Sequence, residues 1–268
     1  MAVSTMVMTM KTQSEKAKVF MQLHLPGNPI VLFNAWDAGS ARVVANAGAL
    51  AIATGSWSVA AAHGYSDGEA LPLALVLANL ARIVQSVELP VTIDFEAGYG
   101  RTPEAVADAV ARALDTGAIG FNIEDQIIGG AGVYDIDAQC ARLNAARKVA
   151  DRAMIPAFIN ARTDLFLKAS PEHHNAQLVA EALQRAQAYA AAGANGFFVP
   201  GLIDENLIGV VCGASPLPVN IMMKPLAPSA KRLAALGVAR ISHGPGPYRQ
   251  AMQLLREAAS AAHRSAAA

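Results

Sequence analysis

Two carboxylates and a glycine loop follow one apolar run and form the most chemically informative feature of this sequence. The segment reads Val91-Thr92-Ile93-Asp94-Phe95-Glu96-Ala97-Gly98-Tyr99-Gly100. Residues two apart on a strand share a face, so we expect Asp94 and Glu96 to point the same way. A second short apolar run ends in Glu124 and Asp125. Several carboxylates that converge on one place require a cation.

The cation that suits these side chains is Mg²⁺, with Mn²⁺ as an alternative. Mg²⁺ prefers oxygen ligands in an octahedron and keeps several waters, so one directly bound carboxylate suffices if others hold the waters. Asp94, Glu96 and Glu124 can supply these oxygens. His173 and His174 lie in a helical, solvent-facing segment, so a histidine-rich zinc site has little support.

Eight apolar runs bounded by turn residues predict the strands that position these side chains. They cover residues 30–35, 49–54, 91–95, 120–123, 157–160, 196–199, 219–223 and 239–242. Helices are expected between them, including 73–87, 103–116, 137–152 and 171–192, and a last helix runs from 247 to about 263 before an alanine-rich tail. Continuous apolar strands suit a parallel sheet buried on both faces. The sequence therefore predicts one (β/α)₈ barrel domain over residues 1–268, with a short N-terminal extension.

In such a barrel the site forms where the strands end, and polar residues follow most of the apolar runs. Arg162 follows the fifth run, where it could neutralise Asp164 or bind a substrate carboxylate in two-pronged fashion; we favour the second role. Lys224, after the seventh run, could form a Schiff base, but an ion pair is the simpler interpretation. His243, after the eighth, is a general base or a capping loop residue. Trp36 follows the first run and is a candidate for substrate binding.

Composition narrows the functional classes. The formal net charge is zero over 268 residues and no long basic run occurs, so nucleic-acid and membrane-surface partners are not expected. The two cysteines, Cys140 and Cys212, indicate free thiols in a reducing compartment. Residues 1–10 are Met-rich but lack the pattern of a signal peptide, and no apolar stretch is long enough to span a bilayer. We expect a soluble, cytoplasmic protein.

The motifs together resemble the isocitrate lyase/phosphoenolpyruvate mutase superfamily, and in particular its small phosphonomutase-like members. Three elements carry the resemblance, in the family's order and spacing over nearly the whole chain. They are Asp94-Phe95-Glu96-Ala97-Gly98-Tyr99-Gly100, Ile123-Glu124-Asp125-Gln126 and Asn160-Ala161-Arg162-Thr163-Asp164.

The resemblance implies a Mg²⁺-dependent barrel that acts on small 2-oxo or 2-hydroxy acids through an enolpyruvate-like intermediate. By position, Asp94 would bind the metal directly, while Glu96, Glu124 and Asp67 would hold its waters. The loop Thr54-Gly55-Ser56 would bind the substrate carboxylate and oxo oxygen, opposite Arg162. A homodimer or homotetramer with exchanged last helices is also implied.

Departures from the family pattern leave the exact reaction open. The stretch 127–134 lacks the Lys-x-Cys-Gly loop of isocitrate and methylisocitrate lyases and the Lys-x-Asn-Ser loop of the mutases, although its glycines suit a closing lid. Tyr134 and His243 are the remaining candidate proton carriers. We expect a carbon–carbon lyase, with decarboxylation of an oxaloacetate-like substrate as the leading example. The alternatives are a phosphono-acid mutase or hydrolase and a non-catalytic barrel that binds 2-oxo acids.

Overall fold

The computed structural model describes residues 11–266, so the Met-rich extension and the last two residues of the alanine-rich tail lie outside the described part. Eight parallel strands form its sheet. They are β1 (Ile30–Leu32), β2 (Ile52–Ala53), β3 (Val91–Asp94), β4 (Gly120–Glu124), β5 (Phe158–Arg162), β6 (Gly196–Phe198), β7 (Val219–Met222) and β8 (Arg240–Ser242). Neighbours pair in the order β1-β8-β7-β6-β5-β4-β3-β2, and a single parallel bridge between Ala35 and Thr54 joins the two ends. The predicted (β/α)₈ barrel is confirmed.

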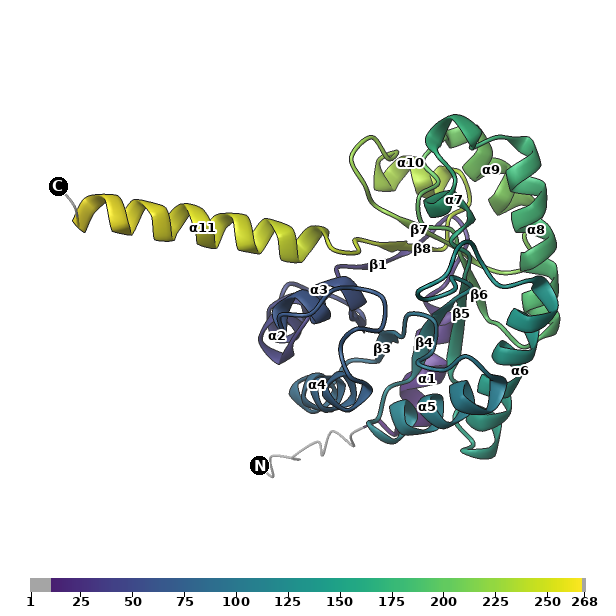
Figure 1. Cartoon of the computed structure of the whole chain (residues 1–268), viewed down its shortest axis with the longest axis horizontal. Helices are drawn as coiled ribbons and strands as arrows, with labels where there is room; N and C mark the ends of the chain where they lie inside the picture. Colours follow the sequence, from purple (N-terminus) through teal and green to yellow (C-terminus); the bar gives the residue numbers. More distant parts are fainter. Residues whose placement is uncertain (1–10, 267–268) are drawn as a thin grey trace, which may run out of the picture.

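Most helices connect successive strands and pack around the sheet in Figure 1, whereas the last one projects away from it. They are α1 (Gln13–Gln22), α2 (Ala38–Asn46), α3 (Ser56–Ala62), α4 (Leu73–Ser86), α5 (Pro103–Asp115), α6 (Ile136–Arg152), α7 (Leu165–Lys168), α8 (Ala176–Ala191), α9 (Glu205–Ala214), α10 (Ala230–Ala235) and α11 (Gly246–Ala266). Polar side chains cap the first turns of several helices. At the start of α5, Thr102 lies directly before Pro103, and its Oγ1 accepts a hydrogen bond from the N–H of Ala105. A threonine cap followed by proline is favoured at a helix N-terminus.

Two kinds of buried residue fill the barrel. Most of the core is aliphatic and aromatic, and α1 closes the amino end of the barrel with Phe20, whose ring meets Phe158 of β5 edge-on. Inside the sheet, however, lies a polar layer of fully or nearly fully buried side chains: Asn122, Asn160, Asn220, Arg240 and Ser242. This layer lies beneath the carboxyl ends of the strands, so it can support polar groups there.

The last helix, α11, leaves the barrel and projects away from it (Figure 1). Of its residues only Pro247 is buried. Beside β1, where a helix would complete the ring of helices, an apolar groove of about 480 Å³ is lined by Val31, Phe33, Val43 and Leu50, among others.

Among residues 11–266, no helix is both long and apolar enough to cross a membrane. Cys140 and Cys212 are both free thiols.

Candidate active site

A cavity of about 160 Å³ opens at the carboxyl ends of the strands. Its lining comes from almost every strand end and comprises Asn34, Gly55, Ser56, Trp57, Asp67, Asp94, Asn122, Arg162, Leu167, Phe198, Met222, Ser242, Gly244 and Pro245. Five of the residues predicted from the sequence therefore lie together here: Gly55, Ser56, Asp67, Asp94 and Arg162. The cavity is smaller than the sites that hold drug-sized ligands, so it suits a small acid.

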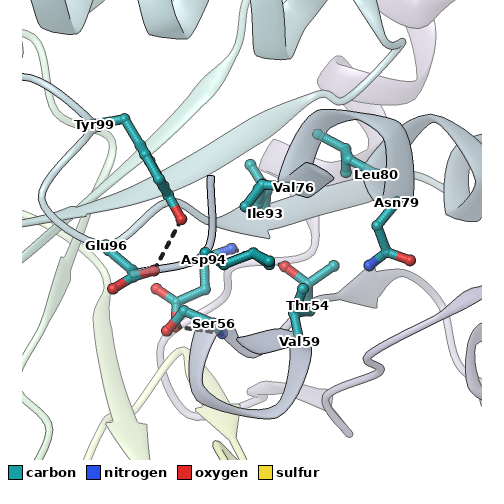
Figure 2. A pocket seen from close by; sticks show the side chains of 11 residues that line it. Thr54, Ser56, Val59, Val76, Asn79, Leu80, Ile93, Asp94, Glu96 and Tyr99 are labelled. Atoms are coloured by element: carbon teal, nitrogen blue, oxygen red, sulfur yellow. Dashed lines mark hydrogen bonds between the residues drawn. The ribbon is translucent and has the colours of Figure 1, made fainter. Parts of the chain in front are cut away.

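Asp94 is the best-anchored carboxylate of the site. It ends β3, and its Oδ2 accepts hydrogen bonds from the backbone N–H of Ser56 at 3.2 Å and from Ser56 Oγ at 2.8 Å. Its Oδ1 accepts from Asn122 Nδ2 at 3.2 Å, and its backbone N–H donates to Thr54 Oγ1. Figure 2 shows Ser56 beside Asp94. Three donors thus hold the carboxylate in one orientation.

Glu96 is close to Asp94 for a different reason from the one predicted. The strand ends at Asp94, so the alternation of a strand cannot set the direction of Glu96. Its backbone is left-handed, with φ 48°, a strained conformation for glutamate. The carboxylate accepts from the N–H of Glu69 at 2.5 Å and from the hydroxyl of Tyr99 at 3.1 Å, the contact drawn in Figure 2. Glu69 and Tyr99 also have positive φ.

Arg162 lies between two carboxylates at the end of β5. Its Nη1 pairs with Glu124 Oε2 at 2.8 Å, and its Nε and Nη2 donate to the two oxygens of Asp164 at 2.5 and 3.0 Å. These contacts engage three of the five N–H groups of a guanidinium. Arg162 therefore neutralises Asp164 and still has two N–H groups that could bind a substrate carboxylate, so the two roles considered for it are compatible.

The positive charge near Asp67, Glu96 and Glu124 is too small to keep their pKa values in the usual range. Burial, together with the charges of Asp67 and Asp94, raises the pKa of Glu96 to about 7, and partial desolvation together with the charge of Asp94 raises the pKa of Asp67. Burial also raises the pKa of Glu124 well above its usual range, although Arg162 acts in the opposite direction. A hard divalent cation would relieve this repulsion, and carboxylate oxygens are the ligands that Mg²⁺ prefers. The donor set therefore fits Mg²⁺.

The carboxylates do not by themselves form a closed metal cage. In the part of the chain that the structure describes, no three His, Cys, Asp or Glu side chains converge as direct ligands. This geometry suits a metal held directly by one carboxylate, with the other carboxylates binding its waters, as expected for Asp94 with Asp67, Glu96 and Glu124.

Six predicted residues do not line the cavity: Thr54, Glu96 and Glu124, which lie behind its wall in the contacts described above, and Trp36, Tyr134 and His243. The Trp36 ring meets Tyr248 edge-on, 5.2 Å away, while Trp57 stands on the cavity wall instead. The Tyr134 ring lies against the Arg142 guanidinium, 4.2 Å from it. His243 packs on Phe33, and burial lowers its pKa.

The other strand-end candidates have separate environments. Asp125 is fully buried and accepts from the backbone N–H of Asp164, from Arg185 and from Tyr189 Oη. These bonds make it a support for the loop that carries Asp164. Lys224 is exposed and lies outside the cavity lining.

The glycine-rich stretch predicted to act as a lid is the tip of a short hairpin. Gln126 and Val133 pair as an antiparallel bridge, and the N–H of Ile127 donates to the carbonyl of Gly132. The Tyr134 carbonyl accepts from Arg185 of α8, which anchors the base of the hairpin. Residues 127–132 lie beyond this anchored base.

Sequence reasoning missed the apolar part of the lining: Trp57, Leu167, Phe198, Met222 and Pro245. It also missed Asn122 and Glu69, which position the carboxylates. A signal for Asn122 was available, because four of the apolar runs contain an asparagine, at Asn34, Asn122, Asn160 and Asn220.

The barrel and its carboxylate-rich mouth define a (β/α)₈ protein with an acidic site at the strand ends, and sequence comparison identifies the family. The model of the phosphoenolpyruvate phosphomutase family matches residues 20–263, and the chain belongs to this family. An uncharacterized protein of Mycobacterium tuberculosis is 36% identical over 243 residues, covering 90% of this chain and 88% of that protein. The 2-methylisocitrate lyase of Escherichia coli is 30% identical over 217 residues, covering 74% of this chain and 70% of the lyase.

Solved structures agree with this assignment. A protein of Burkholderia cenocepacia J2315, provisionally assigned as a phosphonomutase, superposes with a TM-score of 0.91 at 53% identity, covering 93% of this chain and 99% of that one. More distant relatives include an oxaloacetate decarboxylase of Rhodopseudomonas palustris, at 26% identity. A phosphonopyruvate hydrolase, 21% identical with a TM-score of 0.82, has the same fold, and its structure contains oxalate and Mg²⁺. The chain is therefore an enzyme of the isocitrate lyase/phosphoenolpyruvate mutase superfamily.

Proposed function

We propose that this protein is a Mg²⁺-dependent carbon–carbon lyase that acts on a small 2-oxo or 2-hydroxy acid. The observation that carries the proposal is the arrangement around Asp94: an anchored carboxylate among buried acidic side chains, on the wall of a cavity that also contains Arg162. An anionic substrate can approach this acidic site only if cations offset the repulsion. Arg162 supplies one positive charge and the metal would supply the rest.

The chain's own residues bind and orient the substrate in this proposal. Arg162 binds the substrate carboxylate through N–H groups that Glu124 and Asp164 leave free, and those two acids keep its guanidinium in place. Gly55 and Ser56 border the same cavity and hold the oxo-acid end from the opposite side. A bound Mg²⁺ supplies Lewis-acid charge to the carbonyl oxygen on which negative charge develops.

Decarboxylation of an oxaloacetate-like acid is the simplest reaction of this type. The C3–C4 bond breaks, CO₂ leaves, and the electron pair remains on the pyruvate half as an enolate, which takes up a proton at C3. A phosphono-acid mutase or hydrolase is the alternative within the same family. It has less support, because the hairpin 126–133 contains no charged residue that could hold a phosphonate.

The test is a coupled assay for pyruvate on oxaloacetate, 2-methylisocitrate, 2,3-dimethylmalate and phosphonopyruvate, with Mg²⁺ and with EDTA. We expect Mg²⁺-dependent pyruvate from at least one carbon–carbon substrate, and a loss of at least about a hundredfold on Asp94→Asn, since Asp94 is the proposed direct ligand. The exposed Asp108→Asn is the matched control and should keep full activity. Pyruvate formed from phosphonopyruvate alone would favour the phosphono-acid mutase or hydrolase. Equal pyruvate formation with EDTA and with Mg²⁺ would contradict the proposed dependence on a metal.

A further inference from the structure

The segment that carries Asp67 to the cavity has few attachments of its own. It runs from the end of α3 to the start of α4, and residues 62–67 are exposed. Leu71, two residues before α4, is buried and anchors the far end of the segment. In between, every hydrogen bond that joins residues 66–70 to another part of the described chain involves Glu69. The position of Asp67 on the cavity wall therefore depends on Glu69.

Glu69 exchanges hydrogen bonds with the loop after β3. Its N–H donates to Glu96 Oε2 at 2.5 Å, and its own Oε1 accepts from the N–H of Tyr99 at 2.7 Å. The Tyr99 hydroxyl closes the ring of contacts by donating to Glu96 Oε1 at 3.1 Å, as Figure 2 shows. One residue thus links the segment that carries Asp67 to the loop that carries Glu96.

These contacts hold three residues in a backbone conformation that they rarely adopt. The φ angles of Glu69, Glu96 and Tyr99 are 57°, 48° and 53°, all in the left-handed region. Non-glycine residues persist in this region only where the surrounding contacts determine their backbone, and such strain concentrates at functional sites. The hydrogen bonds of Glu69 offset a strain that both loops would otherwise relieve by rearranging.

The two loops differ in their other supports. Arg142 of α6 donates to the carbonyls of Ala97 and Gly100, so the loop after β3 has a second attachment. Residues 66–70 have no second hydrogen-bonded attachment within the described chain. Without the Glu69 carboxylate, only the backbone bond to Glu96 would remain between the loops. Asp67 should then be displaced more than the loop after β3.

We propose that Glu69 is a positioning residue, whose carboxylate holds Asp67 at the cavity and so supports the waters of the bound cation. Glu69 itself does not line the cavity and touches neither cation nor substrate in this proposal. The inference rests on the proposed function, because it assumes that Asp67 and Glu96 bind the waters of a cation whose direct ligand is Asp94. Replacing a residue that supports metal ligands typically weakens metal binding by about 10–100-fold.

Three substitutions at Glu69 separate its hydrogen bond from its charge. Glu69→Gln keeps an oxygen that reaches the N–H of Tyr99 but loses the charge, Glu69→Asp keeps the charge on a side chain one methylene shorter, and Glu69→Ala loses both. Electron paramagnetic resonance of free Mn²⁺ measures cation binding without turnover. We expect Glu69→Ala and Glu69→Asp to bind Mn²⁺ at least about tenfold more weakly than the wild type, and Glu69→Gln to bind it nearly as tightly.

The exposed Glu88→Ala, before β3 and so at the opposite end of the barrel, is the matched control and should bind Mn²⁺ as the wild type does. Wild-type affinity in a folded Glu69→Ala protein would overturn the inference. Binding by Glu69→Gln as weak as that by Glu69→Ala would also overturn it, because the charge rather than the hydrogen bond would then matter.

Chymotrypsin locates the effect, because Tyr65 and Tyr99 provide one cleavage site in each loop. In EDTA, Glu69→Ala should be cut after Tyr65 about tenfold faster than the wild type, since one hydrogen bond controls the population of the opened segment. Cleavage after Tyr99 should change less, because Arg142 still binds that loop. Unchanged cleavage after Tyr65 would overturn the inference. If the wild type binds Mn²⁺ no better than Asp94→Asn, the proposed function fails, while cleavage still decides whether Glu69 holds the segment.

Discussion

At the scale of single residues, His24 is an uncharged histidine held at the closed end of the barrel. It is 6% exposed, its ring stacks on Phe158 with 3.9 Å between ring centroids, and its Nδ1 is 2.8 Å from the carbonyl of Phe20. Burial, and after it the positive charge of Arg240, lowers its pKa to about 3. The folded protein therefore keeps His24 neutral over the whole range in which an ordinary histidine takes up a proton.

This residue should make stability depend on pH in a defined window. Between pH 6.5 and 3 the unfolded chain protonates His24 and the folded chain does not, so the free energy of unfolding falls as the pH falls. Relative to His24→Phe, the wild type should lose up to about 1.4 kcal/mol per pH unit below pH 6.5 and nothing above it. Urea denaturation at pH 8, 7, 6 and 5 measures this difference. The exposed His173→Phe is the control, and parallel curves for wild type and His24→Phe would refute the prediction.

A site residue could be predicted from the sequence where its position in a strand or motif determines its location, and not where distant contacts determine it. Asp94 and Arg162 lie at the mouth of the barrel, as their positions at strand ends predict, and Asp67 lies there too, although only the family resemblance indicated it. The orientation of Glu96 was not predictable, since it depends on Glu69, 27 residues away, and on a left-handed backbone that glutamate rarely adopts. The apolar part of the lining was missed because hydrophobic residues at strand ends look the same whether they face a helix or a ligand.

At the scale of elements, the loop after β3 is held by close packing against the start of α5. A Cβ on Gly100 would lie 2.7 Å from the backbone N of Val106 and from atoms of Ala105. The Gly100 carbonyl also accepts from Arg142 of α6, which binds the carbonyl of Ala97 as well. Glycine is thus required where the backbone of this loop approaches a helix.

Gly100→Ala should therefore destabilise the fold by about 1–3 kcal/mol, the usual cost of an overpacked site. The helix backbone that a methyl group would contact cannot move aside as a flexible side chain can. Gly213→Ala in α9 is the matched control, because a Cβ there meets nothing within 4 Å, and it should be neutral or stabilising by up to about 1 kcal/mol. Chemical denaturation of both variants measures the contrast, and equal effects would count against this packing.

The boundaries of elements show where sequence patterns stop being informative. All eight strands were predicted, but several are shorter than their apolar runs, and the run 49–54 contains a strand of only Ile52–Ala53. The helix expected over 171–192 begins at Ala176, because Asn175 caps it by accepting from the N–H groups of Gln177 and Leu178. Pro171–His173 forms a separate 3₁₀ turn. Periodicity located the elements, whereas local hydrogen bonds decided their ends.

At the scale of the whole molecule, the barrel lacks a covering helix at β1 while α11 has nothing to cover (Figure 1). The groove residues Val31 and Val43 are 46% and 69% exposed, and Leu254 and Leu255 of α11 are 63% and 61% exposed. Exposed apolar side chains in the groove and on α11 are unfavourable in water, and such patches commonly mark a protein–protein contact. We propose that α11 of a second copy fills the groove, in the exchanged arrangement that the family resemblance implies, and that the protein is a homodimer or homotetramer.

Disrupting either surface should dissociate the assembly without unfolding the barrel, since only Pro247 of α11 is buried in a single chain. The double change Leu254→Asp and Leu255→Asp places charge on the helix, and Val43→Asp places charge in the groove. Each should convert the oligomer to a monomer in light scattering coupled to size-exclusion chromatography. Gln253→Ala, an exposed neighbour on the same helix, should leave the mass unchanged. A monomeric wild type, or variants that stay assembled while folded, would show that something other than a second α11 covers the groove.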